Sequence, residues 1–109
     1  MDCDQVRISF SVEPDHCILR LGGALGVASA EELRLAALEL CAYHKDVAVD
    51  WSGVTQLDAG IAQVLLSLRA ALGEQNQSLI GSAAIPPAVE NWLHTAGLSD
   101  ILGKPGRVA

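Results

Sequence analysis

The strongest constraint on the fold is a short apolar run, residues 47–51, that leads within a few residues into a helical repeat. The run reads VAVDW and has little polar alternation, which predicts a central strand covered on both faces of a sheet. A loop over residues 52–56 follows, and Asp58 is placed to cap the next helix. That helix is predicted to stop at Gly73. Its apolar positions recur at helical spacing: Ile61, Val64, Leu65, Leu68 and Leu72.

Two strands are predicted before this strand–helix unit. Apolar residues alternate with polar ones over residues 6–12, the period-two pattern of a strand with one wet face. A turn at residues 13–15 leads into a second strand over residues 16–21, which Gly22-Gly23 is expected to end. Because the connection is short, we expect an antiparallel hairpin.

A first helix is predicted between the hairpin and the apolar run. Ser29 and Glu32 have the spacing of a capping box, so the helix is expected to begin there. His44 and Lys45 sit where cations favour a helix C-terminus. One apolar stripe runs along this segment: Leu33, Ala36, Ala37, Leu40 and Cys41.

The last third of the chain predicts one more strand and one more helix. Residues 78–82 are predicted to form another short strand, Pro86-Pro87 suits the start of a helix, and Gly97 suits a left-handed stop, with a last turn over residues 99–102. Val89, Trp92, Leu93 and Ala96 share a face of this helix. The element order is therefore ββαβαβα, which predicts one α/β domain over residues 1–109.

Composition restricts the classes of partner. The chain carries 7 Lys and Arg against 13 Asp and Glu, a net charge of -6. Such a chain repels phosphate backbones and anionic membrane surfaces, so nucleic acid is not expected as a partner. No stretch approaches the roughly 20 apolar residues that a membrane span requires, so no insertion into a membrane is expected.

The cysteines and the N-terminal residues favour the cytoplasm. Cys3, Cys17 and Cys41 are odd in number and form no CxxC pair, so we interpret them as reduced thiols rather than a disulfide framework. The N-terminal residues include Asp2 and Asp4, whereas a signal peptide begins with basic residues. We therefore expect a cytoplasmic protein.

No pattern in the sequence indicates catalysis or a cofactor. His16, His44 and His94 lack the spacing of a metal site, and no paired carboxylate, triad or nucleotide-binding motif is present. Trp51 and Trp92 lie at apolar positions of a strand and a helix, which favours the core over an exposed contact. We expect no enzyme activity, no cofactor and no metal.

Residues 49–58, VDWSGVTQLD, resemble the STAS family's pattern of a buried strand, the run D-x-S-x-V, and an aspartate that opens the central helix. Residues 19–25, LRLGGAL, and residues 92–102, WLHTAGLSDIL, resemble two further stretches of that family in the same order. The resemblance implies a STAS-type α/β fold with a four- to five-stranded mixed sheet and helices mainly on one face. It also implies the regulatory protein binding of anti-sigma-factor antagonists.

The resemblance implies that a regulatory switch is missing. In the family's phosphorylatable antagonists, the first hydroxyl after the helix-opening aspartate accepts a phosphate, whose charge disrupts partner binding. Here Ala59 follows Asp58, so the acceptor equivalent carries no oxygen. A one-residue deletion would instead place Asp58 at the acceptor position and pair Gly60-Ile61 with the family's Gly-Leu. We favour the ungapped alignment because it keeps the apolar run at residues 64–66 in register.

The resemblance also implies a surface for the partner, formed by the start of the central helix and the loop after the second strand. That loop lacks the acidic residues usual in the family, which indicates a different partner surface. The expected partner is a kinase-like anti-sigma factor or another signalling protein, and the chain a monomer or weak homodimer. The alternative is an accessory subunit of a membrane transporter. The predicted partner-binding residues are Asp58, Ala59, Gly60, Ile61 and Ala62, with Gly22, Gly23, Ala24 and Gly26.

Overall fold

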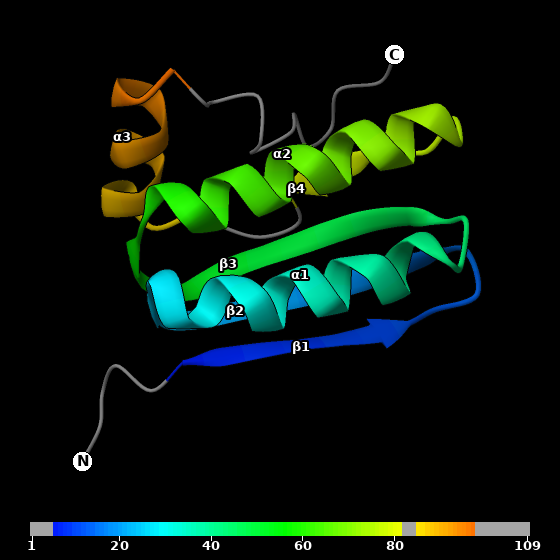
Figure 1. Ribbon diagram of the computed structural model, residues 1–109, viewed down its shortest axis with the longest axis horizontal. Helices are drawn as coiled ribbons and strands as arrows, with labels where there is room; N and C mark the ends of the chain where they lie inside the picture. The colour runs from blue at the N-terminus through cyan, green and yellow to red at the C-terminus, as the bar shows by residue number, and fades with distance from the viewer. Residues whose placement is uncertain (1–5, 82–84, 98–109) are drawn as a thin grey trace.

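The chain forms a four-stranded mixed sheet, seen in a computed structural model that describes residues 6–81 and 85–97. The strands are β1 (Arg7–Val12), β2 (His16–Leu25), β3 (Asp46–Leu57) and β4 (Leu79–Gly81), and they lie in that order across the sheet (Figure 1). β1 and β2 pair antiparallel, whereas β2–β3 and β3–β4 pair parallel. The predicted hairpin and mixed sheet are confirmed.

Three helices complete the described part of the fold. α1 (Val27–Cys41) and α2 (Ala59–Glu74) lie side by side over the same face of the sheet, and α3 (Pro87–Thr95) lies across the end at which α2 begins (Figure 1). The order ββαβαβα is the order predicted. The described part of the chain is therefore an α/β sandwich with its main helices on one face of the sheet.

The core lies between the sheet and the two long helices. Leu33 and Leu40 of α1 are fully buried, as are Leu65 and Leu72 of α2, so both predicted stripes face the sheet. In β3, Val47, Val49 and Trp51 are also fully buried. The alternate residues Ala48 and Asp50 are only half-buried. Within the described residues, the expectation that β3 is covered on both faces is wrong, because the two long helices lie over one face and the alternate residues stay partly exposed.

Both central strands run further than predicted. β2 continues through Gly22-Gly23 to Leu25, and β3 continues through the expected loop at residues 52–56 to Leu57. Gly22 lies opposite Gly53 between two shifts in the register of the β2–β3 pairing. A Cβ on Gly53 would lie 3.3 Å from the Gly22 Cα. The glycines that suggest breaks in the sequence therefore let the two backbones pair closely through an irregular stretch.

The boundaries of α1 also differ from the prediction. The helix begins after Gly26, whose carbonyl accepts from the Ser29 N–H at 2.9 Å, and no side chain caps it. Ser29 is therefore a buried residue of the first turn, and the predicted capping box is wrong. At the other end, α1 stops at Cys41, so His44 and Lys45 follow the helix instead of completing it. His44 adopts a positive φ of 54° in that connection.

The ends of α2 and α3 follow the prediction closely. α2 extends one residue beyond Gly73, and the left-handed residue after it is Asn76, with φ of 62°. α3 has Pro86 at its N-cap, and Gly97 is left-handed with φ of 75°, as predicted. The expected strand residue Ser82 and the expected turn at residues 99–102 lie outside the described residues.

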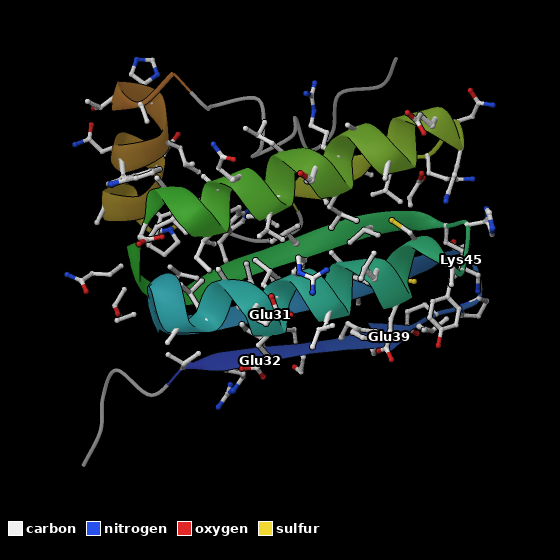
Figure 2. All side chains as sticks on the ribbon, viewed as in Figure 1. Glu31, Glu32, Glu39 and Lys45 are labelled. Carbon is white, nitrogen blue, oxygen red and sulfur yellow. The ribbon has the colours of Figure 1, made fainter. Side chains whose placement is uncertain are left out.

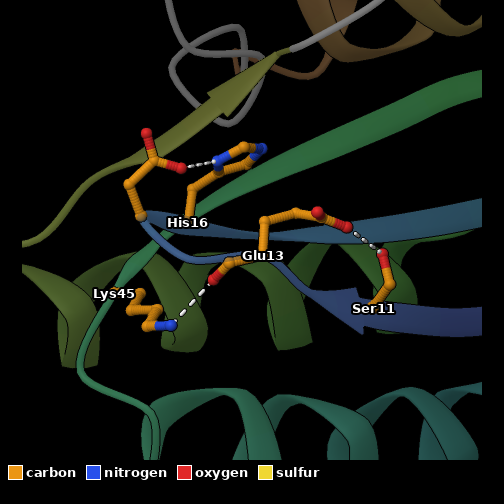
Figure 3. A network of polar contacts seen from close by, with 5 residues as sticks. Ser11, Glu13, His16 and Lys45 are labelled. Atoms are coloured by element: carbon orange, nitrogen blue, oxygen red, sulfur yellow. Dashed lines mark hydrogen bonds and ion pairs between the residues drawn. The ribbon is translucent and has the colours of Figure 1, made fainter.

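Polar contacts tie the β1–β2 turn to the connection after α1 (Figure 3). Lys45 Nζ donates to the Glu13 carbonyl at 2.7 Å, and the Ser11 hydroxyl donates to the Glu13 carboxylate at 3.3 Å. Asp15 contacts His16 Nδ1 at 2.7 Å, and this hydrogen bond lowers the pKa of the fully exposed Asp15 carboxyl. Lys45 thus has a structural partner in place of the predicted helix end.

Candidate functional site

The first turn of α2 is held by its N-cap. Asp58 has extended backbone angles, and its Oδ1 accepts from the Gly60 N–H at 2.8 Å and the Ile61 N–H at 3.4 Å. The Gly60 N–H would otherwise be unpaired at the helix start, whereas the Ile61 N–H also donates to the Asp58 carbonyl at 3.1 Å. The predicted cap is confirmed. Ala59 is exposed beside the cap. The turn therefore presents a methyl group to solvent on a rigid support.

A groove of about 510 Å³ opens in front of this turn. The ends of the two long strands form one wall, and α3 forms the opposite wall. Since β2 and β3 run in parallel, their carboxyl ends meet at this edge of the sheet. We call this feature the α2 groove. It is lined by Ala24, Leu25, Gly26, Thr55, Gln56, Leu57, Asp58, Ala88, Val89 and Trp92.

The described lining of the α2 groove is nearly uncharged. Asp58 is the one ionisable residue within it, and the capping bonds already occupy the carboxylate oxygen that faces the helix. The other lining groups are small or apolar side chains, the amide of Gln56 and the hydroxyl of Thr55. Such a lining favours contact with an uncharged, shaped surface over capture of a phosphate or a metal ion.

Within residues 6–81 and 85–97, no three His, Cys, Asp or Glu side chains gather in a way that could hold a metal ion. The carboxylates of α1 lie on its outer side, where Figure 2 labels Glu31, Glu32 and Glu39. Glu31 is paired with Arg34 at 2.6 Å, and this contact lowers the pKa of the Glu31 carboxyl. Among the helices of the described part, none is long and apolar enough to cross a membrane.

Comparison with known proteins identifies the family. The family model described as "Mlab, STAS domain" matches residues 8–103, which is most of the chain. This chain belongs to the STAS-domain family. No curated protein is a significant match for the STAS chain.

Solved structures share the fold of this STAS domain. An anti-sigma factor antagonist from Mycobacterium paratuberculosis is 18% identical, with 91% of this chain and 84% of that chain covered and a TM-score of 0.73. The anti-sigma factor antagonist SpoIIAA in its unphosphorylated form is 14% identical, with coverage of 90% and 85% and a TM-score of 0.70. The phosphorylated form of SpoIIAA from Bacillus is 13% identical, with coverage of 90% and 88% and a TM-score of 0.64. At these identities the likeness establishes the fold.

The structure brings some of the predicted partner-binding residues together. Ala24, Gly26 and Asp58 line the α2 groove. Ala59 is exposed at the start of α2 next to Asp58, and Gly60 is half-buried behind the cap.

The other predicted partner-binding residues lie inside the protein. Gly22 and Gly23 are buried within β2, because the strand continues where a loop was expected. Ile61 and Ala62 are fully buried in the core under α2. These four residues are therefore buried, whereas Ala59 is exposed.

Sequence reasoning missed most of the groove. Thr55 and Gln56 were expected in a loop, Val89 was expected on the apolar face of the last helix, and Ala88 was not considered. Trp92 was assigned to the core, as was Trp51; Trp51 is fully buried, but Trp92 is half-buried and lines the groove. A signal was available for Trp92, because it lies at the margin of the short apolar stripe of α3.

Proposed function

We propose that this STAS domain is a non-catalytic protein-interaction module of a bacterial regulatory system, which acts in the cytoplasm. The α2 groove and the exposed Ala59 beside it form the partner surface. The observation that carries the proposal is the pairing of an open, nearly uncharged groove with a rigidly capped helix start. A preformed surface of this kind loses little conformational entropy on binding. A kinase-like anti-sigma factor is the partner class that family resemblance suggests.

The same turn argues against a phosphorylation switch at this position. Ala59 has no hydroxyl, so no kinase can transfer a phosphate to it. Binding would then be controlled by the abundance of the chain. The described cysteines add no redox control to this scheme: burial raises the pKa of the Cys17 and Cys41 thiols, which keeps them protonated and poorly nucleophilic.

The role of the groove can be tested with two matched variants, each of which replaces an exposed alanine with arginine. Ala88→Arg places a long cation in the groove, whereas Ala70→Arg places the same side chain on the exposed surface of α2 outside it. Binding to a purified kinase-type anti-sigma factor from the same genome would be measured by titration calorimetry. We expect Ala88→Arg to weaken binding at least about tenfold, because it blocks a desolvated contact, and Ala70→Arg to leave it unchanged. Equal effects of the two variants would contradict the placement of the surface.

The proposed absence of a phosphorylation switch can be tested by adding a hydroxyl group at position 59. Ala59→Ser adds a hydroxyl at the exposed position. After incubation with the same kinase and radiolabelled ATP, we expect more phosphate on the serine and threonine residues of this variant than on those of the wild type. Label in the wild-type peptide that contains residues 58–63 would refute the loss of the switch.

A second candidate is an accessory subunit of a membrane transporter. The absence of a hydroxyl on Ala59 favours it, because a permanently bound subunit has no need of a switch at this position. Purification of the tagged chain from its host separates the two functions. Recovery of a transporter ATPase in stoichiometric amount, lost in Ala88→Arg, would select this role over the signalling one.

A further inference from the structure

β1 is an outer strand whose second edge has no partner among the described residues. It pairs only with β2 and is the outermost strand of the sheet (Figure 1). Natural edge strands are blocked from further pairing by proline, by bulges or by inward-pointing charges. β1 has no proline, its register with β2 is unbroken, and its one charge is Arg7 at the first position. The edge is therefore competent to pair with another strand.

The hydrogen-bonding pattern shows which groups this edge offers. The Glu13 N–H donates to the His16 carbonyl at 2.7 Å, so this opposed pair is a hydrogen-bonded one. In an antiparallel ladder such pairs recur at every second residue. The polar backbone groups of Arg7, Ser9 and Ser11 thus face β2, and those of Ile8, Phe10 and Val12 face outward.

We propose that β1 pairs antiparallel with β1 of a second copy of this chain, across a two-fold axis at Phe10. In this register Phe10 opposes its own copy, Ile8 opposes Val12 of the copy, and Ser9 opposes Ser11. Arg7 lies opposite Glu13 of the copy, on the open face of the sheet. Every cross-strand pair is thus apolar, hydroxyl-to-hydroxyl or of opposite charge, the combinations that stabilise paired strands. The sequence of β1 is complementary to itself.

The exposed apolar surface beside β1 fits the same partner. Val12 is 39% exposed and Tyr43 is 45% exposed, although both are large and apolar or aromatic. The Tyr43 ring packs edge-to-face on Phe10 at 6.4 Å between centroids, so it reaches the edge strand from the end of α1. Pairing at Phe10 brings the same rings of the second copy next to this pair, and covers side chains that water now contacts.

The dimer is a weak one that leaves the functional site open. A single strand pair with a few flanking side chains buries less than the roughly 1,200 Å² of a stable complex, so a dissociation constant of about 100 μM is expected. The described lining of the α2 groove comes from β2, β3, α3 and the connecting residues Gly26 and Asp58, with no residue from β1. Each copy can therefore bind its partner within the dimer.

Sedimentation equilibrium on the full chain, from about 10 μM to about 1 mM, tests the proposal. The wild type is expected to show a monomer–dimer equilibrium, and a monomer throughout this range would overturn it. Val12→Pro removes an outward N–H without touching the bonds to β2 and is expected to abolish the dimer. Val12→Thr keeps that N–H and is expected to retain it. Circular dichroism of both variants confirms that the strand pair with β2 is intact.

A charge exchange tests the register. Arg7→Glu places like charges opposite each other at both ends of the ladder and is expected to weaken the dimer about tenfold. Adding Glu13→Arg to this variant restores opposite charges and is expected to restore the dimer. A double variant as weak as Arg7→Glu alone would overturn this register. A dimer unaffected by Arg7→Glu and Val12→Pro would place the contact elsewhere and overturn the proposal.

Discussion

Replacing Asp58 with alanine removes the group that holds the first turn of α2. Its Oδ1 makes one short bond, 2.8 Å to the Gly60 N–H, and one long bond, 3.4 Å to the Ile61 N–H. Loss of an N-cap costs about 1 kcal/mol, and loss of a negative charge at a helix N-terminus costs a further ~0.5 kcal/mol. We therefore expect Asp58→Ala to lower the free energy of unfolding by about 1.5 kcal/mol. For a domain of this size that corresponds to a melting temperature lower by about 6 °C.

The measurement is urea unfolding followed by circular dichroism, with a thermal scan on the same samples. Asp58→Asn is the matched control, because it keeps a capping oxygen and removes only the charge, so a loss of about 0.5 kcal/mol is expected. If Asp58→Ala unfolds within about 0.3 kcal/mol of the wild type, the capping bonds do not stabilise α2 as reasoned. If Asp58→Asn loses as much as Asp58→Ala, charge rather than capping is the source of the effect.

Three further substitutions probe the strands and the helix end. Gly53→Val places a branched side chain 3.3 Å from the Gly22 Cα, so a loss of about 2 kcal/mol is expected in urea unfolding. Gly73→Ala meets nothing within 4 Å in the last turn of α2 and is expected to raise stability by about 0.5 kcal/mol; a loss would contradict the helical geometry there. Hydrogen bonds from the Ser52 N–H and hydroxyl lower the pKa of Asp50, so its carboxylate stabilises the fold above the ordinary value of 3.8 and less as the pH falls below it. Asp50→Ala should lower the urea midpoint more at pH 7 than at about pH 2.5, and an equal loss at both values would refute this.

The helices were predictable because their signals are local. The apolar stripes of α1 and α2 mark the buried faces, and the Asp58 cap marks the start of α2 to the residue. The exception is the start of α1, where Ser29 and Glu32 have the spacing of a capping box but lie inside the first turn. A box pattern specifies a possible bond, and the chain uses Gly26 as the N-cap instead because β2 runs directly into the helix.

The strand lengths were not predictable in the same way. Gly22-Gly23 and Gly53 are turn signals when they are considered alone. They lie together only when β2 and β3 pair, and Gly53 then makes room for the backbone of Gly22 in the other strand. That information depends on a contact between residues about 30 apart, which no local pattern contains.

This extension of the strands builds the candidate site. If β2 ended at Leu21, Ala24 and Gly26 would have no fixed position relative to Asp58. Because β2 and β3 continue together to the start of α1 and α2, the wall of the α2 groove is part of the sheet. In the proposed function, recognition of a partner then depends on the shape of the backbone and on Trp92 rather than on a charged motif. It follows that a sequence comparison centred on Ala59 can show only that this position carries no hydroxyl, whereas the groove itself must be found from the fold.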